Sequence, residues 1–110
     1  MGFQTYGVGR MTERRALAEA FVESIGWRDA KRTLVTGDAS NRRYDRLTRT
    51  NGETAILMDA PPEKGEDVRP FVYIAEHLLA QGLSAPQIYE VDHEGGFLLI
   101  EDLGNALLPN

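Results

Sequence analysis

Apolar residues recur with helical spacing near the start of the chain. Within residues 12–26 they fall three or four positions apart, at Leu17, Phe21, Val22 and Ile25. This spacing places them on one face of a helix, which Thr12 would cap and Gly26 would end. We therefore predict an amphipathic helix that packs against another surface. Residues 1–11 show no such period and are predicted to be a flexible leader.

Five later segments have the composition of strands, at residues 33–36, 43–49, 54–59, 87–91 and 97–101. The third is apolar almost throughout, which predicts a central strand that is covered on both faces. Asn51 and Gly52 form the strongest hairpin signal, because this pair tolerates positive φ. A second helical stripe follows Asp67, the predicted N-cap, and stops at Gly82.

The predicted order of elements is therefore helix, three strands, helix and two strands. Strands that are joined mainly by hairpins favour a five-stranded, mostly antiparallel sheet. We expect the second helix to pack across one face of this sheet, so the predicted fold class is α+β with an additional N-terminal helix. A chain of 110 residues suits one domain, and no internal repeat interrupts it.

Composition argues against several kinds of function. The net charge of −5 gives no general attraction for nucleic acid or an anionic membrane, and no cysteine is present for disulfides or thiolate zinc sites. A cysteine-free chain is compatible with the reducing cytoplasm, which is the expected location. The sequence contains neither a membrane-spanning apolar run nor a signal peptide. Positive charge is concentrated locally, at Arg42, Arg43, Arg46 and Arg49.

These arginines follow a turn of small residues that is the main candidate site. The turn and its exit comprise Gly37, Asp38, Ala39, Ser40, Asn41, Arg42, Arg43 and Tyr44. Small side chains let backbone N–H groups approach a phosphate, and guanidinium groups add charge and paired donors. The alternative is an ordinary hairpin loop beside a solvated basic strand. Neither a Walker loop nor a dinucleotide-binding glycine motif occurs in the chain.

Other chemistry has little support in the sequence. His77 and His93 are the only histidines and lack metal-ligand spacing, so no metal site is predicted. The acidic residues between positions 59 and 67 suit a solvated loop and a helix cap. No serine lies in a hydrolase motif, and a single tyrosine among arginines is weak support for nucleic-acid binding.

Three sequence blocks together resemble a known family. They are residues 37–44, residues 55–63 with 67–71, and residues 82–86 with 96–104. With these blocks in this order, residues 12–104 resemble the N-terminal lobe of aminoglycoside-phosphotransferase-like small-molecule kinases. Within that family the chain is most similar to the bacterial kinases of N-acetylmuramate and N-acetylglucosamine. The resemblance implies a protein-kinase-like N-lobe.

The resemblance also implies an ATP site. Residues 37–42 would cover the phosphates, residues 55–58 would lie beside the nucleotide, and backbone groups of residues 101–103 would meet the adenine. The implied cofactor-binding residues are Gly37, Asp38, Ala39, Ser40, Asn41, Arg42, Arg43, Ile56, Met58, Glu101, Asp102 and Leu103.

Met58 departs from the family pattern, because kinases place a phosphate-binding lysine at the end of this strand. We hypothesise that Arg42 or Arg43 supplies the missing charge. Neighbouring side chains of a strand point to opposite faces, so only one of the two can lie inside. Glu76 is the obvious carboxylate on the following helix.

The family's catalytic aspartate and magnesium ligands lie in a C-terminal lobe, to which residues 105–110 would only begin the connection. We therefore predict that this chain alone is inactive, has no catalytic residue, and would bind Mg²⁺ only together with that lobe.

The leading interpretation is the ATP-binding lobe of a sugar or amino-sugar phosphotransferase, whose small-molecule substrate binds only to the two-lobed protein. The alternative is a non-enzymatic lobe that serves protein association or weak nucleotide binding. Under either interpretation, Met58 and Leu103 are expected to be exposed on the cleft face and to support self-association. No nucleic-acid or membrane partner is expected.

Overall fold

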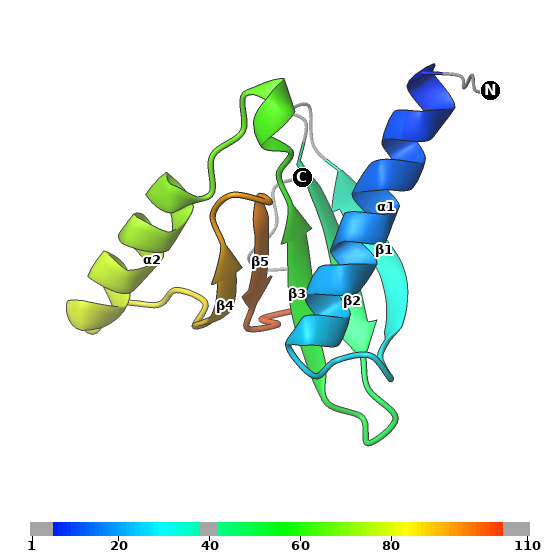
Figure 1. Cartoon of the computed structure of the whole chain (residues 1–110). Helices are drawn as coiled ribbons and strands as arrows, with labels where there is room; N and C mark the ends of the chain where they lie inside the picture. Colours follow the sequence, from blue (N-terminus) through cyan, green and yellow to red (C-terminus); the bar gives the residue numbers. More distant parts are fainter. Residues whose placement is uncertain (1–5, 38–41, 105–110) are drawn as a thin grey trace.

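The computed structural model describes residues 6–37 and 42–104. Its elements are α1 (Tyr6–Ser24), β1 (Lys31–Gly37), β2 (Arg43–Thr48), β3 (Thr54–Asp59), the 3₁₀ turn η1 (Pro62–Lys64), α2 (Arg69–Ala80), β4 (Ile88–Asp92) and β5 (Phe97–Ile100). The strands form one antiparallel sheet in the order β1-β2-β3-β5-β4 (Figure 1). The α+β fold class, the order of elements and the central position of β3 are thus confirmed.

The hairpin between β2 and β3 has the predicted turn. Gly52 has φ of 92°, a conformation that residues with a Cβ rarely adopt. The Asn51 side-chain oxygen accepts a hydrogen bond from the Glu53 N–H at 2.9 Å, and the Arg49 N–H donates to the Glu53 carbonyl at 2.8 Å. These contacts set the register in which every residue of β2 pairs with β3.

Helix α1 covers one face of the sheet and runs in front of β1, β2 and β3 (Figure 1). The buried residues between them, here called the α1-side core, are Ala18, Phe21, Val22, Trp27, Leu47, Ala55, Leu57, Phe97 and Leu99. The rings of Phe21 and Phe97 stack with their centroids 5.5 Å apart. Because β2, β3 and β5 all contribute, α1 holds the middle of the sheet together.

Two sequence expectations about this helix are wrong. Leu17 was expected on the apolar face but is 49% exposed, and Ala18 is buried instead. The buried stripe is therefore centred one position further along the helix. In addition, α1 begins at Tyr6, so residues 6–11 are helical and do not form a separate leader. Helix propagation adds one hydrogen bond per residue, so a nucleated helix extends past a capping candidate such as Thr12.

A polar contact also anchors α1 to the sheet. The guanidinium of Arg14 donates hydrogen bonds to the Gly95 carbonyl at 2.9 Å and to the Asp59 carboxylate. It lies over the Phe97 ring, 4.4 Å from the centroid, where cation and ring attract each other. Helical spacing gives no sign of this contact, because the partners of Arg14 come from a distant strand and a distant turn.

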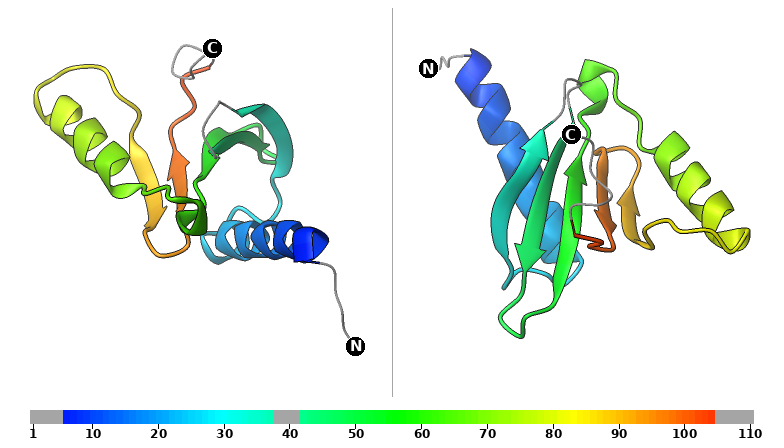
Figure 2. Two further views of the ribbon diagram at one scale, coloured as in Figure 1. Left: turned by 90° about the horizontal axis from the view of Figure 1, so that it is seen from above. Right: turned by 180° about the vertical axis from the view of Figure 1, so that it is seen from behind.

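The opposite face of the sheet has its own core. The buried residues of this α2-side core are Tyr44, Ile56, Met58, Ala60, Val68, Leu98 and Ile100. Helix α2 lies beside β4 in both views of Figure 2, instead of crossing the sheet as expected, and Ala75 is its one buried residue. Phe71 and Val72, near the start of α2, pack against this core.

The hairpin between β4 and β5 approaches the end of β3 closely at Gly96. The Ala60 N–H donates to the Gly96 carbonyl at 2.8 Å, and a Cβ at Gly96 would lie 2.1 Å from the Ala60 oxygen. Gly96 also has φ of 78°. Both the space and the backbone conformation therefore require glycine here.

Candidate nucleotide site

The predicted phosphate loop joins the paired ends of β1 and β2. Gly37, the last residue of β1, pairs with Arg43, the first residue of β2. Four predicted site residues lie between Gly37 and Arg43 but outside the described part of the chain: Asp38, Ala39, Ser40 and Asn41. The structure therefore places the two ends of this loop, at Gly37 and Arg42.

Arg42 and Arg43 point to opposite faces of the sheet. Arg42 donates from Nε to the Glu66 carboxylate at 2.8 Å and interacts with Tyr44, so it belongs to the α2 side. Arg43 donates to the Asp45 carboxylate at 3.1 Å, and its own side chain is 53% exposed. Only Arg42 therefore lies on the face that carries Met58.

The charge of Arg42 is held in place by its neighbours. Burial lowers the pKa of its guanidinium, but hydrogen bonds with Glu66 and Tyr44 more than offset this, so the pKa is raised above its ordinary value. The side chains of Arg42 and Glu66 are 26% and 14% exposed, so both ends of the pair are partly withdrawn from water. A permanent positive charge thus lies immediately before β2.

The carboxylate that meets this arginine is Glu66, and Glu76, the obvious carboxylate of the helix, lies elsewhere. Glu66 lies between η1 and α2, and the side chain of Glu76 is exposed on α2. Sequence reasoning missed Glu66 because it lies in an irregular segment, 24 residues from Arg42. No period or motif connects the two positions, and only the folded chain brings them together.

Ile56 and Met58 lie on β3 where the sequence placed them, but neither is accessible. Both are 0% exposed, and Tyr44 pairs with Met58 across the β2–β3 ladder. The expectation that Met58 is exposed for self-association is therefore wrong, because the side chains of the α2-side core enclose it. Leu103 is 39% exposed, as expected. Contact between Ile56 or Met58 and a nucleotide stays a prediction.

The segment after β5 is tied to β2 by an ion pair. Arg46 donates two hydrogen bonds to Asp102, from Nε at 2.7 Å and from Nη2 at 3.2 Å. The same carboxylate accepts the Gly104 N–H at 2.9 Å. The hydrogen bond from Arg46, which outweighs the effect of burial, holds the pKa of Asp102 below its ordinary value. Asp102 thus uses its carboxylate to position the chain between residues 101 and 104.

The backbone of this segment differs from residue to residue in what it offers a ligand. The Glu101 N–H donates to the Gln87 carbonyl at 2.9 Å, so it is already used. The N–H and carbonyl of Leu103 make no hydrogen bond to another described residue. A donor and an acceptor in adjacent positions match the edge of a planar base, so Leu103 fits the predicted adenine contact.

The two histidines do not add a second site. His77 stacks on Tyr73 on the surface of α2, with ring centroids 6.1 Å apart. Within the described ranges, His, Asp and Glu side chains form no group of three that could hold a metal ion.

No described helix is both long enough and apolar enough to cross a membrane.

Comparison with known proteins identifies the family to which this arrangement belongs. Residues 31–108 match the family described as "Phosphotransferase enzyme family". The chain belongs to this phosphotransferase family. The match begins at β1, so α1 precedes the matched segment. The matched segment includes Arg42, Arg43, Glu66 and the segment after β5.

Curated proteins are similar to the chain over most of its length. A protein of Pseudomonas aeruginosa named N-acetylmuramate/N-acetylglucosamine kinase is 43% identical over 91 residues, which cover 80% of this chain and 26% of that protein. A Caulobacter vibrioides protein of the same name is 34% identical, with 87% and 33% covered. The chain therefore spans about a quarter to a third of the length of these relatives.

Proposed function

We propose that this chain is the ATP-binding lobe of a small-molecule phosphotransferase whose substrate is an amino sugar. Its membership of the phosphotransferase family supports the reaction class, and the names of its relatives support the substrate class. The remaining two thirds or more of those relatives would supply the catalytic groups, so this chain would bind nucleotide without turning it over. The cytoplasmic location stays a prediction.

The observation that carries the proposal is the position of Arg42. Kinases need a cation on this face of the sheet, and Met58 cannot provide one. Arg42 lies on the same face, and Glu66 orients it. Its guanidinium would bind the phosphate oxygens, with paired N–H groups that suit a phosphate better than a single ammonium.

Two further residues would position the nucleotide. Arg46 and Asp102 hold the segment that contains Leu103. The backbone of Leu103 would then contact the adenine edge, which recognises the base without a charged side chain. ATP supplies the transferable phosphoryl group when it is bound. Mg²⁺ would bind only in the two-lobed protein, as the family resemblance implies.

Arg42→Gln and Arg43→Gln form a matched pair that tests the proposal. Both variants remove one positive charge from neighbouring positions, and only Arg42 lies on the Met58 face. Calorimetric titration with ATP should show at least a tenfold loss of affinity for Arg42→Gln, about 1.4 kcal/mol, and less than a twofold loss for Arg43→Gln. Equal losses in both variants, or no binding of ATP to the unmodified chain at about millimolar concentration, would overturn the proposal.

A second candidate function is protein association without catalysis. Tyr73 and Ile74 on α2 are 71% and 55% exposed, so the lobe presents apolar side chains to a partner. Sedimentation at increasing concentration tests this function. Self-association that is lost on Ile74→Glu, in a chain that does not bind ATP, would favour association over nucleotide binding.

A further inference from the structure

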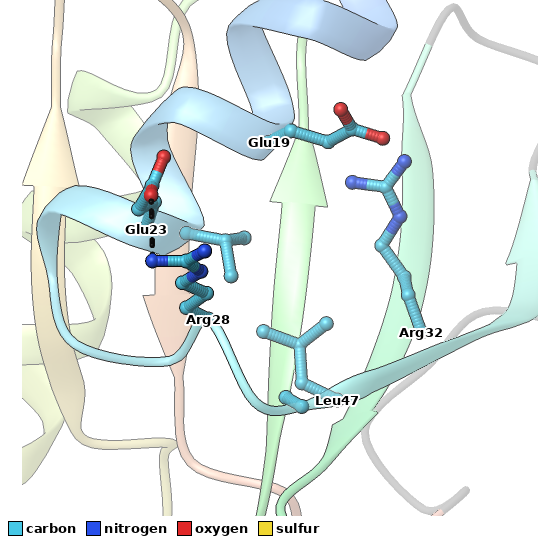
Figure 3. A pocket seen from close by; sticks show the side chains of 7 residues that line it. Glu19, Glu23, Arg28, Arg32 and Leu47 are labelled. Carbon is cyan, nitrogen blue, oxygen red and sulfur yellow. Dashed lines mark ion pairs between the residues drawn. The ribbon is translucent and has the colours of Figure 1, made fainter.

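A pocket of about 460 Å³ lies between α1 and the strands β1 and β2. It is on the α1 side of the sheet, opposite the face that carries Arg42. Its lining residues are Glu19, Val22, Glu23, Arg28, Ala30, Arg32 and Leu47 (Figure 3). Because α1 precedes the segment that matches the phosphotransferase family, one wall of the pocket lies outside that match.

Opposite charges face each other across this pocket. Figure 3 shows the Glu19 carboxylate on α1 and the terminal nitrogens of Arg32 on β1 directed toward each other. Glu19 makes no ion pair with any other residue that the structure describes. The ion pair of Arg32 with Asp45 uses Nε, at 3.4 Å. A carboxylate and the outer end of a guanidinium are therefore both available to a ligand.

The rest of the lining is neutral as a whole. Glu23 and Arg28 pair with each other at 3.5 Å and are exposed at the rim. Val22 and Leu47 are buried members of the α1-side core and make the floor apolar. The pocket thus combines one negative wall, one positive wall and an apolar floor.

We propose that this pocket binds a small zwitterion of the amino-acid class with an apolar side chain. The ligand's ammonium group would pair with Glu19, its carboxylate would pair with Arg32, and its side chain would cover Val22 and Leu47. The volume lies within the usual range of about 300–1,000 Å³ for small-molecule sites. A polyanion such as a nucleotide is disfavoured, because the two carboxylates and two guanidinium groups of the lining leave it without net positive charge.

L-leucine is a suitable probe for the pocket. Nine non-hydrogen atoms and two partly solvated ion pairs suggest a dissociation constant of about 1 mM. Titration of the ¹⁵N-labelled chain at low ionic strength should shift the amide signals of Glu19, Ala30 and Arg32 and leave those of α2 unchanged. The same addition should raise the midpoint of thermal unfolding by several degrees at about ten times that concentration, because the ligand bridges α1 and β1.

Ligands and variants with one charge removed test the assignment of the two walls. Isocaproate retains the carboxylate of leucine without the ammonium, and isoamylamine retains the ammonium without the carboxylate. Each should bind at least fivefold more weakly than L-leucine. Glu19→Gln should weaken the binding of leucine and isoamylamine but leave isocaproate unchanged. Arg32→Gln should weaken the binding of leucine and isocaproate but leave isoamylamine unchanged. Glu76→Gln, on exposed α2, is the control with the same chemistry and should change nothing.

Three results would overturn the inference. They are the absence of saturable shifts with L-leucine, equal binding of the three ligands, and unchanged leucine binding in Glu19→Gln. The last variant removes an exposed carboxylate and should fold normally, which its unligated spectrum would verify. Binding of ATP on the opposite face is measured separately, so failure here would leave the proposed function intact.

Discussion

Arg46 on β2 and Asp102 after β5 are joined by two hydrogen bonds, of 2.7 and 3.2 Å. The two residues are 56 positions apart, and β3 lies between their strands in the sheet. The planar fork of a guanidinium matches the two oxygens of a carboxylate, so this pair fixes orientation as well as distance. It therefore joins the strand after the phosphate loop to the segment proposed to meet the adenine.

Breaking this pair should lower both stability and nucleotide affinity. The side chains of Arg46 and Asp102 are 30% and 9% exposed, so the pair is better shielded than a surface pair. We expect Arg46→Lys and Asp102→Asn each to lower the free energy of unfolding by about 1–2 kcal/mol, measured by urea denaturation. Arg69→Gln removes an arginine that is 70% exposed and should leave the free energy of unfolding unchanged within experimental error. Equal effects at Arg46 and Arg69 would contradict this prediction.

The stability of the chain should depend on pH through Asp102. Its pKa is lower in the folded chain than in the unfolded chain, chiefly because of the hydrogen bond from Arg46. The ionised form is thus stabilised by folding, and this contribution is present above a pH of about 4 and is lost as the pH falls through the folded-state pKa. Urea midpoints measured between about pH 6 and pH 2.5 should fall less steeply for Asp102→Asn than for the unmodified chain. If the urea midpoint depended on pH equally in Asp102→Asn and in the unmodified chain, Asp102 would not contribute to the pH dependence of stability.

Gly96→Ala should be strongly destabilising. A Cβ at this position meets the Ala60 carbonyl oxygen at 2.1 Å, and the backbone has φ of 78°. We expect the free energy of unfolding to fall by about 2–4 kcal/mol, because backbone strain at residue 96 is combined with displacement of the end of β3. Gly52→Ala shares the positive φ but has open space around it, so it should cost only about 1 kcal/mol. The difference between the free energies of unfolding of the two variants, measured by urea denaturation, separates the cost of the Cβ clash from the cost of the positive φ.

Phe21→Ala should loosen α1 from the sheet. Phe21 is 8% exposed and stacks on Phe97, so we expect Phe21→Ala to lower the free energy of unfolding by about 3–5 kcal/mol. Trp27, the only tryptophan, is buried in the same core, so its emission should shift to longer wavelength as the helix separates. Leu17→Ala is the control, because Leu17 is 49% exposed and should contribute less than about 0.5 kcal/mol. If the Trp27 emission of Phe21→Ala stayed at the wavelength of the unmodified chain, this packing would be contradicted.

Much of the fold is readable from local pattern. The run of apolar residues in β3 predicts its central place, because only a strand covered on both faces is apolar throughout. The Asn51–Gly52 pair likewise predicts a turn whose geometry depends on those two residues alone. The alternation of a strand also requires Arg42 and Arg43 to face opposite sides.

The class of fold, the order of the elements and the family resemblance could thus be predicted before folding was considered, since they depend on short-range spacing and on motifs. The folded chain was needed to show which arginine shares a face with Met58, that Glu66 is its partner, and that Asp102 pairs with Arg46. It also placed Glu19 opposite Arg32. Charge pairs act through space, and the members of these pairs come from segments that only the folded sheet brings together.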